Sequence, residues 1–234
     1  MKDLFLLDDN ITYLNHGSYG ACPIPVFEKY QNWQRKLEEQ PVQFMTKIIW
    51  ENLKISRDTL GKFLGCSGED LVLFPNPTTA VNNIIENLNL SQNDEVLMTQ
   101  HEYGALVRAW LRSSKKNNFL IIQQHIDLPL HSKNMFVNQF LSGVTKNTKV
   151  IFISQITSQT GLIFPVKEVC DYARQKGIIT IIDGAHVPGH IDLNVSDLSC
   201  DYYTGACHKW MCAPKGSSFL FVKKSLQAHL KPQI

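Results

Sequence analysis

The sequence has few of the features that identify membrane, secreted or nucleic-acid-binding proteins. No apolar run approaches the roughly 20 residues that a membrane-spanning helix needs, and two acids break the apolar stretch 4–7, which makes it too short for a signal peptide. The six cysteines form no Cys-x-x-Cys pair, and a chain of 234 residues with 44% hydrophobic residues needs no disulfides to stabilise a core. The formal net charge of +2 comes without a basic stripe. We therefore expect a reduced, cytoplasmic protein with a small-molecule ligand and without nucleic-acid or membrane partners.

Common motifs of enzymes and metal proteins are missing as well. The sequence has no Gly-x-Gly-x-x-Gly, Walker loop or Gly-x-Ser-x-Gly elbow, which disfavours the commonest nucleotide-binding and hydrolase functions. His101 and the glutamate after it would begin a zinc-binding His-Glu-x-x-His, but Ala105 occupies the second histidine position. The cluster of Cys207, His208 and Cys212 lacks a spaced fourth ligand. We expect no metal site, and a metal-dependent protein built on this cluster is the alternative that metal analysis would test.

Short apolar runs alternate with segments of helical periodicity along most of the chain. Two helices are expected first, at 25–40 and 46–64, the second ended by Gly65. Strands are then expected at 71–74, 95–98, 119–123, 150–154, 178–183, 201–204 and 218–222, and helices at 78–90, 103–115, 134–142 and 166–176. This alternation predicts an α/β fold, a three-layer sandwich in which a mostly parallel sheet of about seven strands is covered on both faces. We expect an N-terminal arm and helix over residues 1–45 and one large domain over residues 46–234.

Chemically distinctive residues follow the carboxyl ends of these predicted strands. They are Thr78 and Thr79 after the first strand, Tyr103 after the second, Ser158 after the fourth, Asp183 at the end of the fifth and Lys209 after the sixth. In an open α/β sheet, ligands lie outside the carboxyl ends of the strands. We therefore expect these side chains to converge on one small-molecule site.

Lys209 and Asp183 have the surroundings that most favour chemistry. Lys209 lies between an apolar run and a Pro-Lys-Gly turn, and a lysine held in such a desolvated place can be a neutral, nucleophilic amine. Asp183 ends an apolar strand, and a buried acid needs a cationic or hydrogen-bonding partner to remain ionised. The alternatives are an ordinary surface lysine and an acid that only caps a turn or a helix.

Two further stretches could border the same site. Thr78 and Thr79 begin a predicted helix, where free backbone N–H groups attract an anion such as phosphate, although a threonine that only caps the helix is the alternative. The stretch 13–23 places turn-forming residues and a proline around His16 and Gly17, so that its backbone can approach a ligand closely. A terminal arm that merely crosses the surface is the alternative for this stretch.

Taken together, four motifs resemble those of the class V pyridoxal phosphate enzymes. They are Pro-Thr-Thr-Ala at 77–80, Thr-Ser-Gln-Thr-Gly at 157–161, Asp-Gly-Ala-His at 183–186 and Cys-His-Lys-Trp at 207–210. The Asn-His-Gly-Ser-Tyr-Gly stretch at 15–20 and the run at 101–110 most resemble the isopenicillin N epimerase-like branch, which is related to cysteine desulfurases. The likeness extends over almost the whole chain and implies the large domain of pyridoxal phosphate fold type I.

The resemblance implies roles for the residues nearest the reacting atoms. Lys209 would form a Schiff base with pyridoxal 5'-phosphate, Asp183 would pair with the pyridine nitrogen, and His186 would contact the phenolic oxygen. His16 and Gly17 would lie on the substrate side of the site.

The resemblance also implies contacts with the rest of the cofactor. Thr78, Thr79 and His208 would hold the phosphate. Tyr103 would stack on the ring, at a position where desulfurases have histidine and where any aromatic face serves. Ser158 stands where many relatives have asparagine, and it would make a shorter contact with the cofactor.

At the level of function, the resemblance implies an enzyme that acts on an amino acid or a derivative of one. It would be either epimerase-like or a carbon–sulfur lyase of the desulfurase type, and a homodimer. Family members usually continue into a small C-terminal domain that carries an arginine for the substrate carboxylate, and the residues up to Ile234 contain no match for it. We therefore expect that small domain to be absent, and a truncated, non-catalytic cofactor-binding or interaction fragment is the alternative function.

Overall fold

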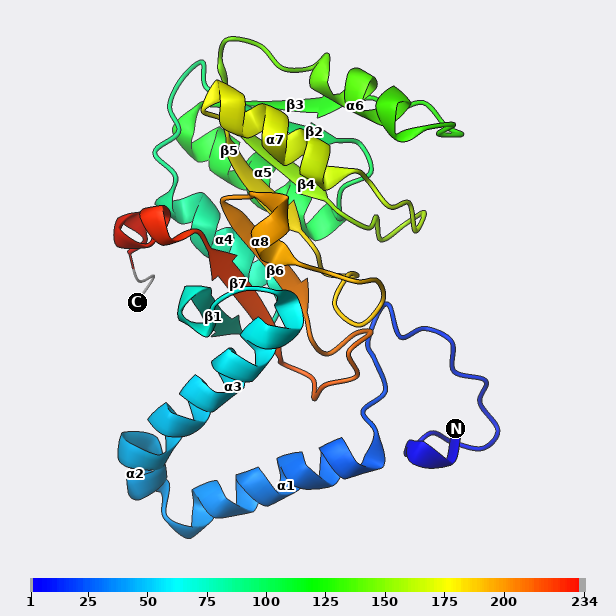
Figure 1. Ribbon diagram of the computed structural model, residues 1–234, viewed down its shortest axis with the longest axis vertical. Helices are drawn as coiled ribbons and strands as arrows, with labels where there is room; N and C mark the ends of the chain where they lie inside the picture. The colour runs from blue at the N-terminus through cyan, green and yellow to red at the C-terminus, as the bar shows by residue number, and fades with distance from the viewer. Residues whose placement is uncertain (1, 232–234) are drawn as a thin grey trace.

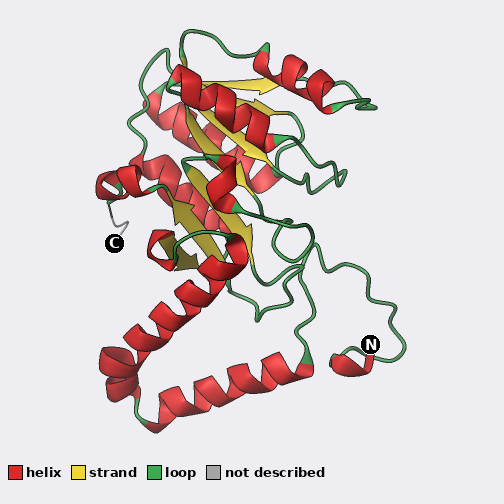
Figure 2. Ribbon diagram, viewed as in Figure 1, coloured by secondary structure: helices red, strands yellow, loops and turns green. Residues whose placement is uncertain are grey.

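Seven strands form one sheet between two layers of helices in the computed structural model, which describes residues 2–231 (Figures 1 and 2). The strands are β1 (Leu71–Phe74), β2 (Glu95–Thr99), β3 (Leu120–Gln124), β4 (Thr148–Ser154), β5 (Ile179–Asp183), β6 (Tyr202–Ala206) and β7 (Ser218–Val222). The helices are α1 (Ile24–Glu39), α2 (Pro41–Gln43), α3 (Ile49–Leu64), α4 (Pro77–Asn87), α5 (Gly104–Asn117), α6 (Lys133–Leu141), α7 (Val166–Lys176) and α8 (Val195–Leu198), with a π-helical turn at Phe44–Ile48. The expected three-layer α/β fold is confirmed, and residues 232–234 of the expected large domain lie outside the described part.

The strand order brings one end of six strands to the same edge of the sheet. The order is β1-β7-β6-β5-β4-β2-β3, and β7 is antiparallel to both of its neighbours, β1 and β6. The remaining pairs, from β6 through to β3, are parallel. The carboxyl ends of β1 to β6 therefore meet at one edge, which we call the carboxyl edge, and their first residues form the opposite amino edge.

Each face of the sheet carries its own hydrophobic core, because strand side chains alternate between the two faces. In β4, Val150 and Phe152 belong to the core beneath α4 and α5. Ile151 and Ile153, between and after them, belong to the core beneath α6 and α7. Burial on both faces explains why this strand is a continuous apolar run rather than an alternating one.

The ends of the helices have residues suited to those positions. Asn76 caps α4, since its side-chain oxygen accepts a hydrogen bond from the backbone N–H of Thr79 at 2.8 Å, so the alternative that a threonine caps this helix is wrong. Gly65 and Gly177 end α3 and α7 in the left-handed conformation, each with a φ of 68°. Glycine adopts that conformation without the steric cost that a Cβ atom brings.

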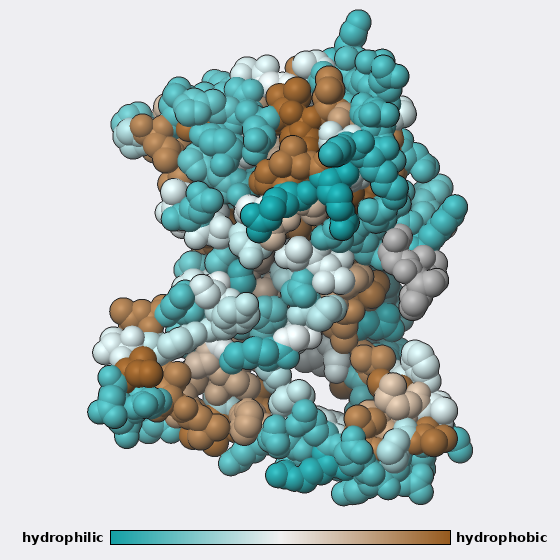
Figure 3. All heavy atoms as spheres, turned by 180° about the vertical axis from the view of Figure 1, so that it is seen from behind, coloured by the Kyte–Doolittle hydropathy of each residue, from teal (hydrophilic) through white to brown (hydrophobic). Residues whose placement is uncertain are grey.

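An arm made of α1, α2 and the first turns of α3 projects from the body of the molecule (Figure 1). None of the described side chains of α1 is buried, and the arm joins the body where Leu64, at the end of α3, is fully buried. Figure 3 shows apolar side chains over the corner between α1 and α3, where Val42 and Trp50 are 76% and 65% exposed. The division expected at residue 45 stays a prediction. Within residues 2–231, no helix has both the length and the apolar character that crossing a bilayer requires.

Candidate active site

A cavity of about 920 Å³ opens at the carboxyl edge of the sheet. It is bordered by the turns that follow β1, β2, β4, β5 and β6 and by a stretch of the N-terminal segment before α1. Of the candidate site residues named from the sequence, all but His16 line this cavity. They are Gly17, Thr78, Thr79, Tyr103, Ser158, Asp183, His186, His208 and Lys209. The convergence expected from the strand ends is therefore present in the structure.

Asp183 is the last residue of β5 and is only 4% exposed. Within residues 2–231 its carboxylate accepts a single hydrogen bond, from the backbone N–H of Ala185 at 2.9 Å. Burial raises the pKa of Asp183, while that hydrogen bond and the positive charge of Lys209 act in the opposite direction. The carboxylate therefore lies in an apolar place with capacity left for a cationic partner.

Lys209 lies in the connection between β6 and β7, with its side chain partly buried in the cavity. Burial lowers the pKa of its amine, and the negative charge of Asp183 partly offsets the effect. The N-terminal segment packs directly on this connection, since the backbone N–H of Gly20 donates to the carbonyl of His208 at 2.7 Å. A Cβ atom at position 20 would lie 1.9 Å from the carbonyl oxygen of Lys209, so only glycine permits this approach.

His186 contacts the amine of Lys209. Its Nε2 lies 3.1 Å from Nζ of Lys209, and its Nδ1 accepts a hydrogen bond from the indole N–H of Trp210 at 3.3 Å. Burial lowers the pKa of His186 to about 4, and the charges of Lys209 and His190 act in the same direction. The imidazole is therefore neutral at physiological pH.

His190 also lines the cavity, although the backbone between it and His186 is a series of turns. Gly189 has a φ of 80°, which rules out the regular helix that would place the two histidines one turn apart. Instead Nδ1 of His190 donates to the carbonyl of His186 at 3.1 Å, and its ring stacks on Trp210 with centroids 4.3 Å apart. The spacing in the sequence gave no indication of this pairing.

The first turn of α4 and the connection after β6 form the polar end of the cavity. Thr78 and Thr79 lie in that first turn, and the hydroxyl of Thr79 donates to Asn76 at 3.0 Å. Nδ1 of His208 donates to the carbonyl of Ser217 at 2.8 Å, so its Nε2 is the nitrogen left for a ligand. The positive end of the helix dipole favours an anion here.

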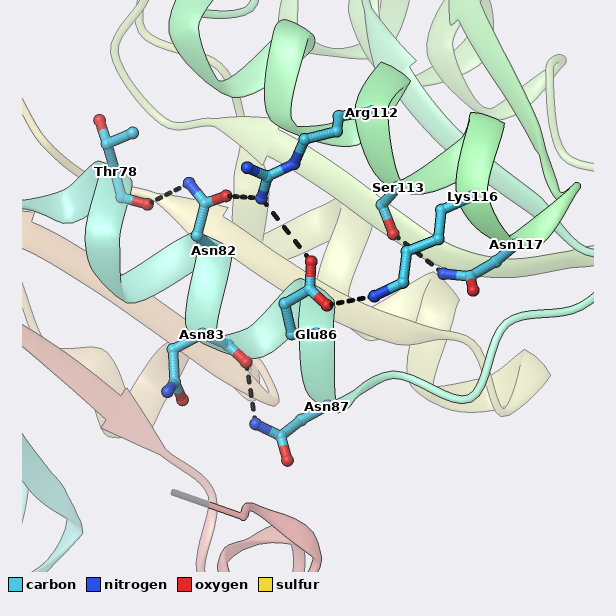
Figure 4. Close-up of polar contacts among 9 residues, drawn as sticks. All are labelled: Thr78, Asn82, Asn83, Glu86, Asn87, Arg112, Ser113, Lys116 and Asn117. Carbon is cyan, nitrogen blue, oxygen red and sulfur yellow. Dashed lines mark hydrogen bonds and ion pairs between the residues drawn. The ribbon is translucent and has the colours of Figure 1, made fainter. Parts of the chain in front are cut away.

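A polar network on the outer side of α4 connects that helix to α5 (Figure 4). The side-chain amide of Asn82 donates to the carbonyl of Thr78 at 2.8 Å and accepts from Arg112 at 2.9 Å. Glu86 forms ion pairs with Arg112 at 3.6 Å and Lys116 at 3.1 Å. The network joins the two helices whose N-termini border the cavity.

Three other candidates differ in how far they reach into the cavity. Tyr103 precedes the first turn of α5, lines the cavity and is 46% exposed. Ser158 lies in the loop after β4 and also lines the cavity. His16 is the candidate that does not line it. Its Nδ1 accepts from the backbone of Ala21 at 3.3 Å, and its ring packs edge-on against Tyr13 at 5.0 Å.

Glu102 is a buried acid next to the site that the sequence interpretation missed. It is 2% exposed, and its carboxylate accepts hydrogen bonds from the backbone and hydroxyl of Ser154 at 2.8 and 2.6 Å and from the hydroxyl of Thr99 at 2.6 Å. Burial raises its pKa to about 7, and the negative charge of Asp183 adds to the effect. The signal in the sequence is that Glu102 lies just beyond the apolar strand predicted at 95–98, at the edge where the other site residues lie.

The cysteines and the metal alternative can be compared with the structure. All six cysteines, which fall within the described part, are free thiols, and burial raises the pKa of Cys207 to about 12. Across residues 2–231, no group of three or more histidine, cysteine or acidic side chains is arranged to hold a metal ion.

Comparison with known proteins identifies the family of this chain. The model of the aminotransferase class-V family matches residues 14–234. The chain is 32% identical over 228 residues to an isopenicillin N epimerase of Streptomyces clavuligerus, covering 97% of this chain and 57% of that protein. It is 24% identical to a probable cysteine desulfurase of Halalkalibacterium halodurans, covering 99% of this chain and 59% of that one.

A solved structure confirms the fold. It is a mutant of C-DES with glycine covalently linked to its PLP cofactor, and it superposes with a TM-score of 0.88 at 20% identity, covering 100% of this chain and 62% of that chain. The present chain thus spans less than two thirds of the length of each of these relatives. On the match of its sequence to the family model, the chain belongs to the aminotransferase class-V family, whose enzymes depend on pyridoxal phosphate and act on amino acids.

Proposed function

We propose that this chain binds pyridoxal 5'-phosphate covalently through Lys209 and serves a reaction at the α-carbon of an amino acid or a derivative of one. The observation that carries the proposal is the meeting of a desolvated amine, a buried carboxylate and a neutral imidazole in one cavity at the carboxyl edge. These three groups are Lys209, Asp183 and His186. Membership of a family of pyridoxal phosphate enzymes supports the same conclusion.

The buried carboxylate fits the ring of this cofactor. The carboxylate of Asp183 accepts one hydrogen bond, from Ala185, and burial raises its pKa. These properties suit an acid that binds a cationic group of a ligand. A protonated pyridine nitrogen would supply an opposite charge and a hydrogen bond, and both favour the ionised form of Asp183. His186 would present a ring nitrogen to the phenolic oxygen beside Lys209.

The polar end of the cavity fits a phosphate group. Thr78 and Thr79 lie in the first turn of α4, where the backbone favours an anion. His208 donates through Nδ1 to Ser217, so it would face the phosphate with Nε2. That nitrogen donates only when the ring is protonated, and an adjacent anion would raise the pKa of His208, which burial otherwise lowers.

The remaining candidates would complete the walls of the site. Tyr103 lines the cavity and is partly exposed, so its ring could stack on a flat cofactor, and Ser158 would offer a short polar contact. Gly17 borders the cavity on the substrate side, where a Cβ atom would lie 3.0 Å from Cζ2 of Trp210. His16 would act through the N-terminal segment that it supports, since it does not line the cavity within the described residues.

The chain's own groups can move the proton that this chemistry requires. When bound, pyridoxal phosphate supplies an electron sink for the α-carbon of an amino acid substrate. Lys209, released when the substrate amine takes its place, would be the base whose Nζ accepts the α-proton and returns it. Its lowered pKa favours the neutral amine that this role needs. Delivery of a proton to the opposite face by a second donor would give epimerase-like activity, whereas loss of a sulfur substituent would give carbon–sulfur lyase activity.

The proposal extends to the oligomeric state and the cellular location of the protein. The exposed apolar residues at the corner of the arm, among them Val42 and Trp50, favour a homodimer that covers this surface. We place the protein in the cytoplasm because its cysteines are free thiols within the described structure.

A second candidate is a cofactor-binding or interaction protein without turnover. It is favoured by the exposed apolar side chains of the arm, among them Val42 and Trp50, which offer a surface for a protein partner.

Reduction with borohydride tests the proposal directly. The purified chain is mixed with pyridoxal phosphate, its absorption spectrum is recorded, and the reduced protein is digested for mass spectrometry. We expect a visible absorption band and a cofactor-modified peptide that contains Lys209, and we expect Lys209→Ala to lose both. Lys215→Ala is the matched control, because Lys215 also lines the cavity. Modification at Lys215 would contradict the proposal, and cofactor attachment without turnover of any amino acid would favour the second candidate.

A further inference from the structure

We propose that Trp210 is a positioning residue for the amine of Lys209, because its indole N–H fixes which nitrogen of His186 carries the proton. The inference deepens the proposed function, on which the role of Lys209 rests. It concerns side chains of this chain alone, so it can be tested before any cofactor is added.

The direction of one hydrogen bond determines the others. The indole nitrogen of tryptophan is a donor only, so the contact of 3.3 Å makes Nδ1 of His186 the acceptor. A neutral imidazole carries one N–H, which must then lie on Nε2. That Nε2 lies 3.1 Å from Nζ of Lys209, and an N–H facing this atom makes a hydrogen bond only when the amine accepts it. This arrangement therefore favours the neutral amine, which a nucleophile must be, over the ammonium form of Lys209.

The indole is held in place from three sides. His190 stacks on it with centroids 4.3 Å apart and an interplanar angle of 22°, and His190 is itself anchored to the carbonyl of His186. Gly17 leaves room on another side, since a Cβ atom there would come within 3.0 Å of Cζ2 of Trp210. On a third side is the ring of His16, which belongs to the N-terminal segment and whose centroid lies 6.5 Å from that of Trp210. His16 and Gly17 are thus linked to Lys209 through Trp210.

The positive charges nearest His186 oppose its protonation. Lys209 and His190 are the titratable groups that act on it, and both lower its pKa, whereas Asp183 also lines the cavity and its negative charge would act in the opposite direction. A doubly protonated ring would carry an added N–H on Nδ1 that faces the indole N–H, so the contact with Trp210 opposes protonation. Burial alone already lowers the pKa of His186.

Nitrogen NMR of the histidine rings measures the proton positions directly. Long-range 1H–15N spectra of the 15N-labelled 234-residue chain distinguish a protonated from an unprotonated ring nitrogen. We expect His186 to be protonated at Nε2 and not at Nδ1 throughout the neutral pH range. A wild-type spectrum with Nδ1 protonated would overturn the proposal by itself, without any variant.

Trp210→Phe keeps an aromatic ring on His190 and removes only the indole N–H. We expect the ratio of the Nε2–H form to the Nδ1–H form of His186 to fall by about fivefold, the effect of losing one ordinary hydrogen bond. The pKa of His186 should rise in the same variant, since the contact that opposes protonation of Nδ1 is gone. An unchanged ratio and an unchanged pKa would mean that Trp210 only packs.

Trp110→Phe is the matched control. Trp110 is buried in the core beneath α5, and its indole nitrogen has no hydrogen-bond partner in the described part of the chain. We expect the signals of His186 to be unchanged, and a change equal to that in Trp210→Phe would assign the effect to general loosening of the fold. The spectra require no cofactor, so absence of cofactor binding would overturn the proposed function and leave the assignment of Trp210 standing.

Discussion

The acidic residues at the two edges of the sheet differ in how many partners their carboxylates have. At the amino edge, Glu95 accepts hydrogen bonds from the hydroxyls of Thr145 and Thr148, at 2.5 and 3.3 Å. Asp201, at the same edge, accepts from Thr180 through both backbone and hydroxyl and pairs with Lys223 at 3.1 Å.

At the carboxyl edge, by contrast, Asp183 accepts one hydrogen bond within residues 2–231. Acids that only hold the fold together have their partners within the chain, whereas an acid with capacity left over belongs to a ligand. The comparison therefore supports our proposal that Asp183 is the acid that serves the site.

Replacement of Asp183 by asparagine should have the largest effect on cofactor binding. The variant loses the charge that would pair with the pyridine nitrogen, and we expect the affinity for pyridoxal phosphate to fall on the order of 100-fold, as for a charged hydrogen bond of about 1.5–3 kcal/mol. The cofactor-free protein should be as stable as wild type or more stable, because a poorly partnered buried charge is removed. Spectroscopic titration and urea unfolding measure the two quantities.

Asp201→Asn is the matched control at the amino edge. Here the substitution breaks the pair with Lys223, so we expect unfolding to be easier by about 1–3 kcal/mol, with cofactor affinity unchanged within twofold. If both variants lost stability and both kept their affinity, the distinction between the two edges would be wrong.

The second prediction concerns Glu102, which combines features of both edges. It has three hydrogen bonds, like a structural acid, yet burial raises its pKa from the ordinary value of 4.5 to about 7. A pKa raised in the folded state adds stability that is fully present below the unfolded pKa and is lost as the pH rises through the folded pKa. The contribution of Glu102 should therefore decline by about 3 kcal/mol between pH 4.5 and 7.

Glu102→Gln isolates this effect. The amide would place a donor where Ser154 or Thr99 also donates, so the variant should be less stable than wild type at pH 5, and the difference should shrink as the pH rises to 8. Urea unfolding of both proteins across this range measures the difference, which cancels the titration of other groups. A difference that stays constant from pH 5 to 8 would contradict the raised pKa, because it would mean that Glu102 is ionised throughout this range.

A third prediction tests how closely the N-terminal segment must approach the site. In Gly20→Ala, the added Cβ atom would meet the backbone carbonyl of Lys209 at 1.9 Å, and backbone cannot move away as a flexible side chain does. We expect a loss of about 1–3 kcal/mol in the free energy of unfolding and a weaker affinity for the cofactor, because the connection that carries Lys209 shifts.

Gly104→Ala is the control for this variant. The nearest atom to its added Cβ lies 3.7 Å away on the side chain of Arg108, in the first turn of α5. Stability and cofactor affinity should stay within the range of a surface substitution, about 0.5 kcal/mol. Equal losses in the two variants would mean that the contact between Gly20 and Lys209 has no special importance.

The sequence was sufficient for the elements that local pattern determines. The strands at 71–74 and 218–222 and the helix at 166–176 have the bounds that periodicity predicted. The bounds differ where tertiary contacts decide: β6 extends to Ala206, because Gly205 and Ala206 pair with β7 despite their poor strand propensity.

The end of α4 shows the same limit of local pattern. The helix expected to reach residue 90 ends at Asn87, because the backbone of Leu88 is extended and Leu88 and Leu90 pack against the core. Helical periodicity alone does not show where the chain must leave a helix to bury a side chain.

The candidate site divides in the same way. The strand ends predicted that Asp183 and Lys209 would converge, since a parallel sheet determines where its carboxyl ends lie. The partners of Glu102 and Trp210 depend on which side chains from distant segments meet, and one sequence holds no record of that. Ser154 lies 52 residues from Glu102, and His186 lies 24 residues from Trp210.

The smallest effect is expected outside the cavity, at the ion pairs that join α4 to α5. Arg112 and Lys116 are 67% and 66% exposed, so solvent and salt weaken their attraction to Glu86. Glu86→Gln should lower the free energy of unfolding by about 0.2–1 kcal/mol, and the loss should diminish at high salt. Cofactor affinity should not change, because Asn82 still connects Thr78 to Arg112. Urea unfolding at low and high salt, with a cofactor titration, tests both statements, and a clear loss of affinity would show that the spacing of α4 and α5 is set at this exposed network rather than by the buried core beneath them.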